Sequence, residues 1–266
     1  MTVFEKLDEI MAKVDLHKIE PLFSIEVSAL NSRYETTITR EGNNLLRVMA
    51  KLIAYSNNAP SDKITQLLET DYFELAFHRF DLAAVASDTP ERIVKSHWPT
   101  IKAIRFQKKV GYIVECARLL LEHGKDKATI ESLYQQYNIP TKLANSEDID
   151  SFWQKFDTLL IRYERERMPY FKNMTTLLHL LLHVGFPCVK PDLVVMRTAA
   201  QIGLVQGRDN HNAYRPAERK LVVKTIQEYC LSRSVHPAII DLYLLVHGRQ
   251  LDSIKYVSQD FIPVAV

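Results

Sequence analysis

Residues 168–204 read MPYFKNMTTLLHLLLHVGFPCVKPDLVVMRTAAQIGL, and this stretch decides the fold class. Apolar residues at helical spacing predict a helical hairpin over about 168–184. The turn Gly185-Phe186-Pro187 then leads into another helix from about Pro191 to Ile202, which Gly203 closes. Helices joined by such short turns are typical of an all-α fold.

The rest of the chain carries the same helical signals. Asn43 or Asn44 is placed to cap the helix that follows it, and Thr89-Pro90-Glu91 is a typical helix start. Periodicity and caps predict helices over 3–17, 45–55, 61–68, 71–80, 89–96, 108–123, 216–231 and 237–247. Few alternating β-branched runs are present, so the whole chain is predicted to be all-α.

Composition limits the function classes without selecting one. The 266 residues are 47% hydrophobic and carry a net charge of +2, so any DNA-binding surface has to come from local clustering of charge. Cys116, Cys188 and Cys230 have neither zinc-site nor redox spacing, which indicates a reduced, cytoplasmic protein. The amphipathic N-terminus is unlike a signal peptide, and the apolar run Leu177–Val184 is too short to span a bilayer.

Several short motifs occur in a fixed order along the chain. Residues 191–197, PDLVVMR, followed by Ile202-Gly203-Leu204, resemble a V-D-T-H-V-x-R motif and its apolar-Gly-Leu stop. Upstream, residues 168–192 align without a gap with an LPGVGxKTA hairpin region, and downstream His247-Gly248-Arg249 resembles an H-G-R ending. These motifs are those of the helix-hairpin-helix DNA glycosylases, and the H-G-R ending is that of the endonuclease III branch.

Earlier segments resemble the same superfamily. The segment Phe77-His78-Arg79-Phe80-Asp81 and the later Ile104-Arg105 with Lys109 resemble the 3-methyladenine DNA glycosylase I branch. Residues 101–124 also resemble endonuclease III. The resemblance covers roughly 44–125 and 168–250.

The resemblance implies a two-lobed helical DNA glycosylase fold with a helix-hairpin-helix element. Residues 44–178 are expected to form a central helical-barrel lobe that includes the first hairpin helix. Residues 1–43 and 179–266 are expected to form a second helical lobe. Such a fold binds double-stranded DNA and flips a damaged base out of the duplex.

The sequence also departs from the family pattern. Tyr170 and Lys172 replace the two hairpin glycines, and Met174 stands at the position of the lysine that bifunctional enzymes use. Because Met174 has no nucleophilic amine, a monofunctional glycosylase is expected. The four-cysteine iron–sulfur loop and the N-terminal zinc ligands are missing, so neither an iron–sulfur cluster nor zinc, nor any other cofactor, is expected.

Asp192 is the candidate catalytic residue that the resemblance supplies. Breaking an N-glycosidic bond places positive charge on the deoxyribose, and a nearby carboxylate stabilises that charge and orients the attacking water. The alternative is that Asp192 only caps the helix that follows, which Pro191-Asp192 suits well.

Three groups of residues are candidates for contact with DNA. Lys172, Asn173 and Thr175 at the hairpin are placed to meet a phosphate, and the alternative is a solvated loop. The turn Ser56-Asn57-Asn58 lies where the family fills the gap left by a flipped base, although such a turn also ends helices in general. The third group consists of basic residues before the helix 108–123, with Arg105 and Lys109 as the contacts that we expect.

Other candidate residues have an ordinary alternative. Tyr55 and Phe106 are candidates for stacking on an extruded base, yet aromatic residues at helical spacing usually belong to the core. His179 and His183 have a metal-binding spacing, but without a glutamate between them they are expected to pack or to form hydrogen bonds. The later basic group, Arg208, Arg215, Arg219 and Lys220, is mixed with acidic residues and is a weaker signal.

The sequence leaves three functional hypotheses open. The first is a monofunctional glycosylase that removes a damaged base, with an alkylated base as one candidate. The second is a protein of the same fold that recognises DNA or a lesion without cutting it. The third is an all-helical protein-interaction domain whose similarity to the family is confined to the fold.

Overall fold

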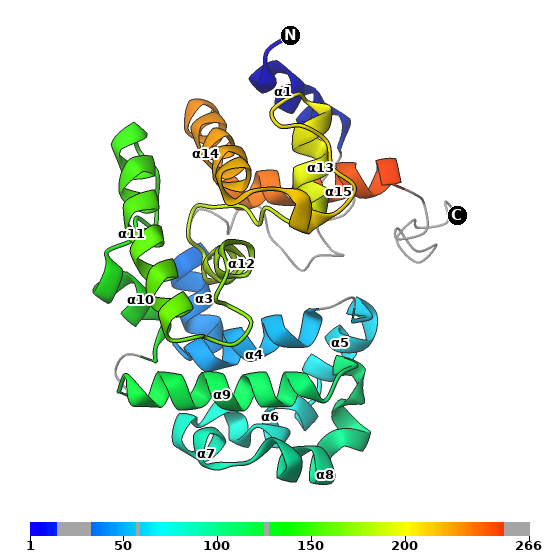
Figure 1. The fold of residues 1–266 in the computed structure, drawn as a ribbon, viewed down its shortest axis with the longest axis vertical. Helices are drawn as coiled ribbons and strands as arrows, with labels where there is room; N and C mark the ends of the chain where they lie inside the picture. The colour runs from blue at the N-terminus through cyan, green and yellow to red at the C-terminus, as the bar shows by residue number, and fades with distance from the viewer. Residues whose placement is uncertain (15–32, 57–58, 125–127, 253–266) are drawn as a thin grey trace. The chain divides into compact units, whose positions relative to one another are not determined.

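The structure is a computed structural model that describes residues 1–14, 33–56, 59–124 and 128–252 (Figure 1). Every regular element in these ranges is a helix, and the β-type pairing within them is an isolated bridge between Asn44 and Thr129. The predicted all-α class is confirmed.

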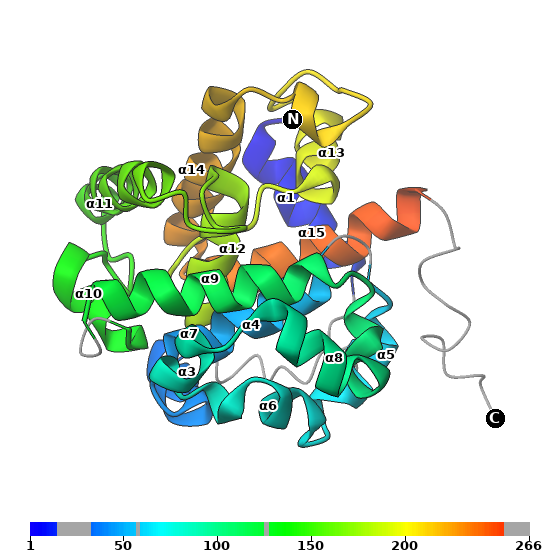
Figure 2. The ribbon, with the colours of Figure 1, turned by 60° about the horizontal axis from the view of Figure 1, so that its bottom comes forward.

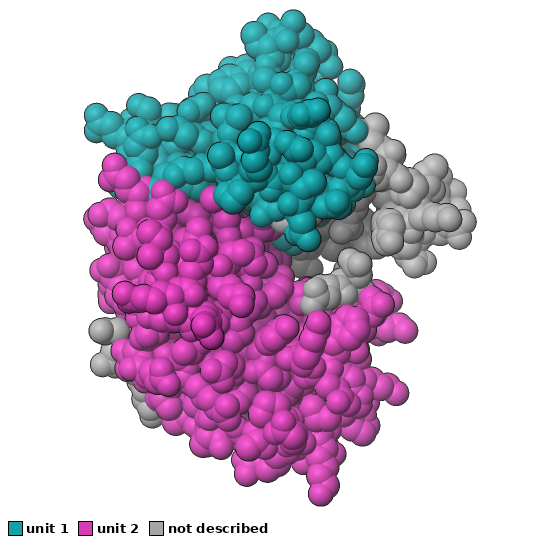
Figure 3. All heavy atoms as spheres, viewed as in Figure 1, with its two compact units in different colours: residues 1–36, 140–153, 185–266 teal, residues 37–139, 154–184 magenta. Residues whose placement is uncertain are grey.

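The chain forms two compact units, which Figure 3 colours separately. Unit 1 consists of Met1–Thr36, Pro140–Trp153 and Gly185–Val266, and unit 2 consists of Thr37–Ile139 and Gln154–Val184. The bounds of these units differ from those of the expected lobes.

The differences fall in three stretches. Residues 37–43 and 179–184 belong to unit 2, and residues 140–153 belong to unit 1. The last of these stretches includes the start of α11 (Ser146–Arg165), whose Trp153 indole N–H donates a hydrogen bond of 2.8 Å to Gln227 of unit 1. This buried bond fixes the first half of α11 within unit 1.

Unit 2 is built from helices, several of which begin at a side-chain cap. Its helices are the end of α3 (Arg33–Glu41), α4 (Leu45–Tyr55), α5 (Ser61–Leu68), α6 (Tyr72–Ala76), α7 (Leu82–Ser87), α8 (Pro90–Ile101), α9 (Lys108–Glu122), α10 (Ile130–Tyr137), the second half of α11, and α12 (Met174–Val184). Asn44 and Thr89 are N-caps, as predicted, because each side chain accepts a hydrogen bond from a backbone N–H of the first turn. Helix α5 begins at Ser61, and Pro60 occupies its cap position.

Helix α9 organises unit 2. It packs against α4 and against α7 and α8, and both ribbon views show α4 alongside it (Figures 1 and 2). The buried face of α9 carries Val110, Ile113, Val114, Ala117 and Leu120. These positions recur at helical spacing, so the amphipathic pattern of the sequence places α9 at the centre of the core.

Unit 1 is arranged around its last helix. The helices of unit 1 are α1 (Val3–Lys13), the first half of α11, α13 (Leu193–Gln201), α14 (Pro216–Arg233) and α15 (Pro237–Asp252), and α15 packs against α1, α13 and α14. Gly248 permits a close approach to α13, since a Cβ atom there would lie 2.5 Å from Cγ1 of Val194. The glycine of the His-Gly-Arg sequence therefore has a packing role.

The expected hairpin over 168–184 is a turn followed by one helix. Residues 168–173 form turns, and α12 begins at Met174. The helix before the turn is α11, which ends at Arg165. Tyr170 has a φ of +66°, so at the position where the family pattern has glycine the backbone adopts the left-handed conformation that glycine favours.

Candidate nucleic-acid interface

The turn between α8 and α9 concentrates positive charge. Residues 101–110 contain four basic side chains and no acidic one. A 3-10 helix over Lys102–Ile104 leads out of α8, and Lys102, Arg105 and Lys108 are exposed. We call residues 101–110 the basic turn.

A strained backbone shapes the basic turn. Arg105 has φ +75° and ψ −41°, and the N–H of Phe106 donates to the carbonyl of Ile104 at 3.0 Å. This is the geometry of a γ-turn with a positive φ, which is rare for a residue with a side chain. Such a conformation costs about 1–3 kcal/mol, so the rest of the turn has to hold it in place.

Phe106 stands next to that strained residue and is surrounded by cations. Its side chain is 36% exposed. The guanidinium carbon of Arg105 lies 5.0 Å from the ring centroid, and the ammonium nitrogens of Lys108 and Lys109 lie 5.6 and 6.0 Å from it. These are cation–π distances, and the exposed Arg105 and Lys108 form one surface with the ring.

Lys109 fastens the basic turn to the end of α4. Its side chain is fully buried, and its ammonium donates hydrogen bonds to the carbonyls of Ala54 at 2.8 Å and Ser56 at 2.7 Å. The last carbonyls of a helix have no partner within that helix and carry its negative dipole end. The buried ammonium of Lys109 provides hydrogen bonds for these carbonyls, and its positive charge is favourable at the negative end of the dipole.

The position of Lys109 corrects the sequence-based prediction, which made it a DNA contact. Its ammonium is buried and donates hydrogen bonds to two carbonyls, so it links the basic turn to the end of α4. Burial, and then the nearby charges of Arg105 and Lys108, lower the pKa of Lys109 from 10.5 to about 8. The sequence contained a signal for this: Lys109 shares the apolar face of α9 with Ile113 and Cys116.

The end of α4 brings two more predicted residues to the same place. The hydroxyl of Tyr55 is hydrogen-bonded to that of Thr65 at 2.9 Å, and the hydroxyl of Ser56 donates to the carbonyl of Ile53 at 2.7 Å. Ser56 is buried, so its side chain ends the helix and does not face a ligand. Asn57 and Asn58 lie outside the described residues.

The predicted phosphate contacts at the hairpin lie at the start of α12. Asn173 accepts the N–H of Thr176 at 3.1 Å and so caps this helix. Lys172 is exposed, which suits a phosphate contact. Thr175 is 5% exposed and is a core residue in this structure, which corrects its predicted role as a DNA contact.

Asp192 belongs to unit 1 and is the N-cap of α13. One of its carboxylate oxygens, Oδ1, accepts the N–H groups of Val194 at 3.0 Å and Val195 at 3.2 Å. The other oxygen, Oδ2, lies 3.5 Å from the ammonium of Lys190, and the side chain is 29% exposed. The capping role that the sequence suggested is therefore present, and the side chain remains partly exposed.

A charged network around Asp88, which sequence reasoning missed, holds the second strained segment of unit 2. His78, Arg79 and Phe80 have consecutive φ values of +49°, +51° and +60°. Asp88 bonds to His78 at 2.7 Å and pairs with Arg92 at 2.6 Å. Burial by itself raises the pKa of Asp88, but the hydrogen bonds from Arg92, His78 and a backbone N–H outweigh it and hold the pKa at about 2. The i,i+4 spacing of Asp88 and Arg92 is a local signal, whereas the partnership with His78 joins two segments and leaves no local pattern.

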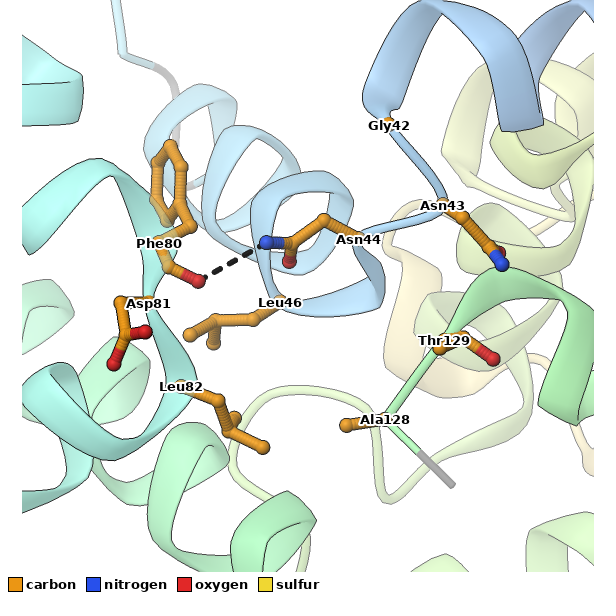
Figure 4. Close-up of a pocket in the computed structure, with 9 residues that line it drawn as sticks. All are labelled: Gly42, Asn43, Asn44, Leu46, Phe80, Asp81, Leu82, Ala128 and Thr129. Carbon is orange, nitrogen blue, oxygen red and sulfur yellow. Dashed lines mark hydrogen bonds between the residues drawn. The ribbon is translucent and has the colours of Figure 1, made fainter. Parts of the chain in front are cut away.

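A hollow of about 260 Å³ in unit 2 lies where three helices begin (Figure 4). Asn44, Asp81 and Thr129 line it, and each caps its own helix with its side chain. The amide of Asn44 also donates to the carbonyl of Phe80 at 3.0 Å, drawn as a dashed line. These side chains are therefore engaged in capping α4, α7 and α10, and Asn44 also links α4 to the segment before α7.

The remaining candidates are the two histidines with metal-binding spacing and the three cysteines. The rings of His179 and His183 meet edge to face with their centroids 4.6 Å apart. Within the described ranges no group of three or more His, Cys, Asp or Glu side chains is arranged to hold a metal ion. Cys116, Cys188 and Cys230 are buried and form no disulfide bonds in the described part of the chain. None of the helices in the described part of the chain is long and apolar enough to cross a membrane.

Comparison with known proteins finds no matching family model, no similar curated protein and no similar solved structure.

Proposed function

We propose that this chain is a DNA-binding protein and that the basic turn contacts the phosphate backbone. The observation that carries the proposal is the exposure of Lys102, Arg105 and Lys108 on one turn that Lys109 anchors from beneath. Phosphate contacts supply most of the affinity of nucleic-acid-binding proteins, and they need exposed cations held in a fixed register.

Because the chain is nearly neutral overall, a DNA-binding surface has to come from a local cluster of cations. With a net charge of +2, the protein has no general attraction for a polyanion. In the later basic group in unit 1, Arg208 and Arg215 are paired with Glu218, at 2.9 and 3.5 Å. The basic turn contains no acidic residue, so it is the better candidate for the interface.

The test is the salt dependence of DNA affinity. We expect the logarithm of the association constant for a labelled duplex to fall linearly with the logarithm of salt concentration. In the variants Lys102→Gln and Lys108→Gln, the slope should be smaller by about 0.9 for each phosphate contact removed. Fluorescence anisotropy titrations at several salt concentrations measure both the affinity and the slope.

The matched control is Lys13→Gln, which removes an exposed lysine of α1 in unit 1. This variant should keep the wild-type slope. A duplex affinity that is absent, or that is unchanged in the variants of the basic turn, would reject the proposed interface.

A second candidate function is excision of a damaged base, with Asp192 as the catalytic carboxylate. Its support is the resemblance of residues 191–197 to the glycosylase motif, together with the state of Asp192 itself. The capping bonds use Oδ1, whereas Oδ2 faces a single lysine at a side chain that is 29% exposed. Such an oxygen is available to stabilise positive charge on a sugar.

A further inference from the structure

We propose that Phe106 stacks on an unpaired base, so that the preferred ligand is DNA with single-stranded or locally unpaired nucleotides. This inference rests on the proposed DNA binding and narrows its substrate class. Single-stranded DNA is bound in general by exposed aromatic rings that lie within a positively charged surface. Phe106 and the basic turn combine these two features.

The presentation of Phe106 is specific to the turn. An exposed phenylalanine is unfavourable in water, yet this ring follows directly on the γ-turn at Arg105 and is 36% exposed. Lys109 is bonded to α4 below the ring. Strain that the surrounding structure maintains is characteristic of ligand-binding segments.

The ring suits the base of a nucleotide, and the cations near it suit the phosphate. Arg105 and Lys108 have their charged groups 5.0 and 5.6 Å from the ring centroid. A base that lies on the ring therefore brings its own phosphate, or the next one, within reach of these side chains. The ring would bind the base without regard to its identity, because every base has an aromatic face.

An intact duplex does not offer such a base. The faces of its bases are covered by their neighbours in the stack, and extruding one costs a few kcal/mol, least where the base is already unpaired. Duplex DNA therefore contacts the basic turn through phosphates alone. Single-stranded or gapped DNA adds the stacking interaction.

The experiment compares three labelled DNAs of the same sequence: a single strand, a complete duplex and a duplex with a one-nucleotide gap. Affinities are measured for the wild type and for Phe106→Leu, which keeps an apolar side chain and removes the ring. The variant Phe106→Trp keeps a stacking surface. The control Tyr72→Leu removes another exposed aromatic ring of unit 2, which is 54% exposed on α6.

We expect the wild type to bind the single strand and the gapped duplex more tightly than the complete duplex. The variant Phe106→Leu should lose about tenfold in affinity for the first two and keep its affinity for the complete duplex. Phe106→Trp and Tyr72→Leu should preserve the wild-type preference.

Equal affinity of the wild type for all three DNAs would overturn the stacking role and leave the proposed DNA binding intact. An equal loss for all three DNAs in Phe106→Leu would do the same. Absence of binding to every DNA would reject the proposed function and this inference with it.

Discussion

Lys109 is the residue whose environment makes the clearest prediction about pH. Its pKa is about 8 in the folded protein and 10.5 for an ordinary lysine, so between these values the unfolded chain binds more protons than the folded one. The free energy of unfolding therefore rises with pH in this window, and the contribution of Lys109 amounts to about 3 kcal/mol at most. Urea unfolding of the wild type and of Lys109→Met, from pH 7 to pH 10.5, measures it.

The variant Lys109→Met separates this titration from all others. Methionine has no titrating group, so the stability of the variant lacks the rise with pH that Lys109 gives the wild type. The stability difference between wild type and variant should therefore grow above pH 8. A difference that stays constant across the window would show that Lys109 does not titrate with a lowered pKa.

Lys109 also illustrates what the sequence predicts at the residue scale. Lysine is rarely buried, and a lysine in a basic cluster is ordinarily a surface residue. The residue type suggested a DNA contact, whereas the position on the apolar face of α9 indicated burial. Lys109 is buried, as its position indicated, because two carbonyls at the end of α4 accept hydrogen bonds from its ammonium.

At the scale of the elements, Gly248 predicts how closely α13 and α15 approach each other. A Cβ atom at Gly248 would lie 2.5 Å from Cγ1 of Val194 and 3.0 Å from Oγ1 of Thr198. Both atoms belong to a packed helix face, so we expect Gly248→Ala to lower the free energy of unfolding by about 1–3 kcal/mol. Urea denaturation measures the loss.

The matched control is Gly111→Ala in the middle of α9. A Cβ atom there would meet only Cγ of Pro90 at 3.9 Å, an ordinary contact. Because alanine is the better helix former, this variant should gain about 0.5–1 kcal/mol. Adding Val194→Ala to Gly248→Ala should restore part of the lost stability, because it removes the Cγ1 atom that the new Cβ meets. Equal effects of the two glycine variants would show that Gly248 has no packing role.

Helices such as α4, α9 and α14 were predictable from the sequence, whereas α3, α7 and α10 and the backbone conformations of several turns were not. Asn44 and Thr89 cap their helices through side-chain oxygens, a local interaction that leaves a local signature. The positive φ values at Arg105 and His78 have no such signature, because neither residue is a glycine. Tertiary contacts maintain these conformations, and such contacts join segments that are far apart in the sequence.

At the scale of the whole molecule, the two candidate functions depend on different parts of the chain. The basic turn lies in unit 2, and Asp192 lies in unit 1. The sequence-based site combined residues of both units. Of that site, the structure brings Tyr55, Ser56, Arg105, Phe106 and Lys109 together at the end of α4 and the start of α9. DNA binding and base excision are consequently separable by variants that each change one unit.

The variant Asp192→Asn tests excision without disturbing the fold. Asparagine accepts the same capping hydrogen bonds from Val194 and Val195, and the lost ion pair with Lys190 is worth no more than about 1 kcal/mol at a partly exposed site. If Asp192 stabilises the developing positive charge, release of bases from a methylated duplex should fall by about 10²–10⁴-fold, with DNA affinity nearly unchanged. The control Lys190→Gln removes the same ion pair and keeps the carboxylate, so it should release bases at the wild-type rate. Equal release by the wild type and Asp192→Asn would exclude a catalytic role for the carboxylate. If the wild type releases no base while it binds DNA, the basic turn describes the function of the chain, and Asp192 is a helix cap.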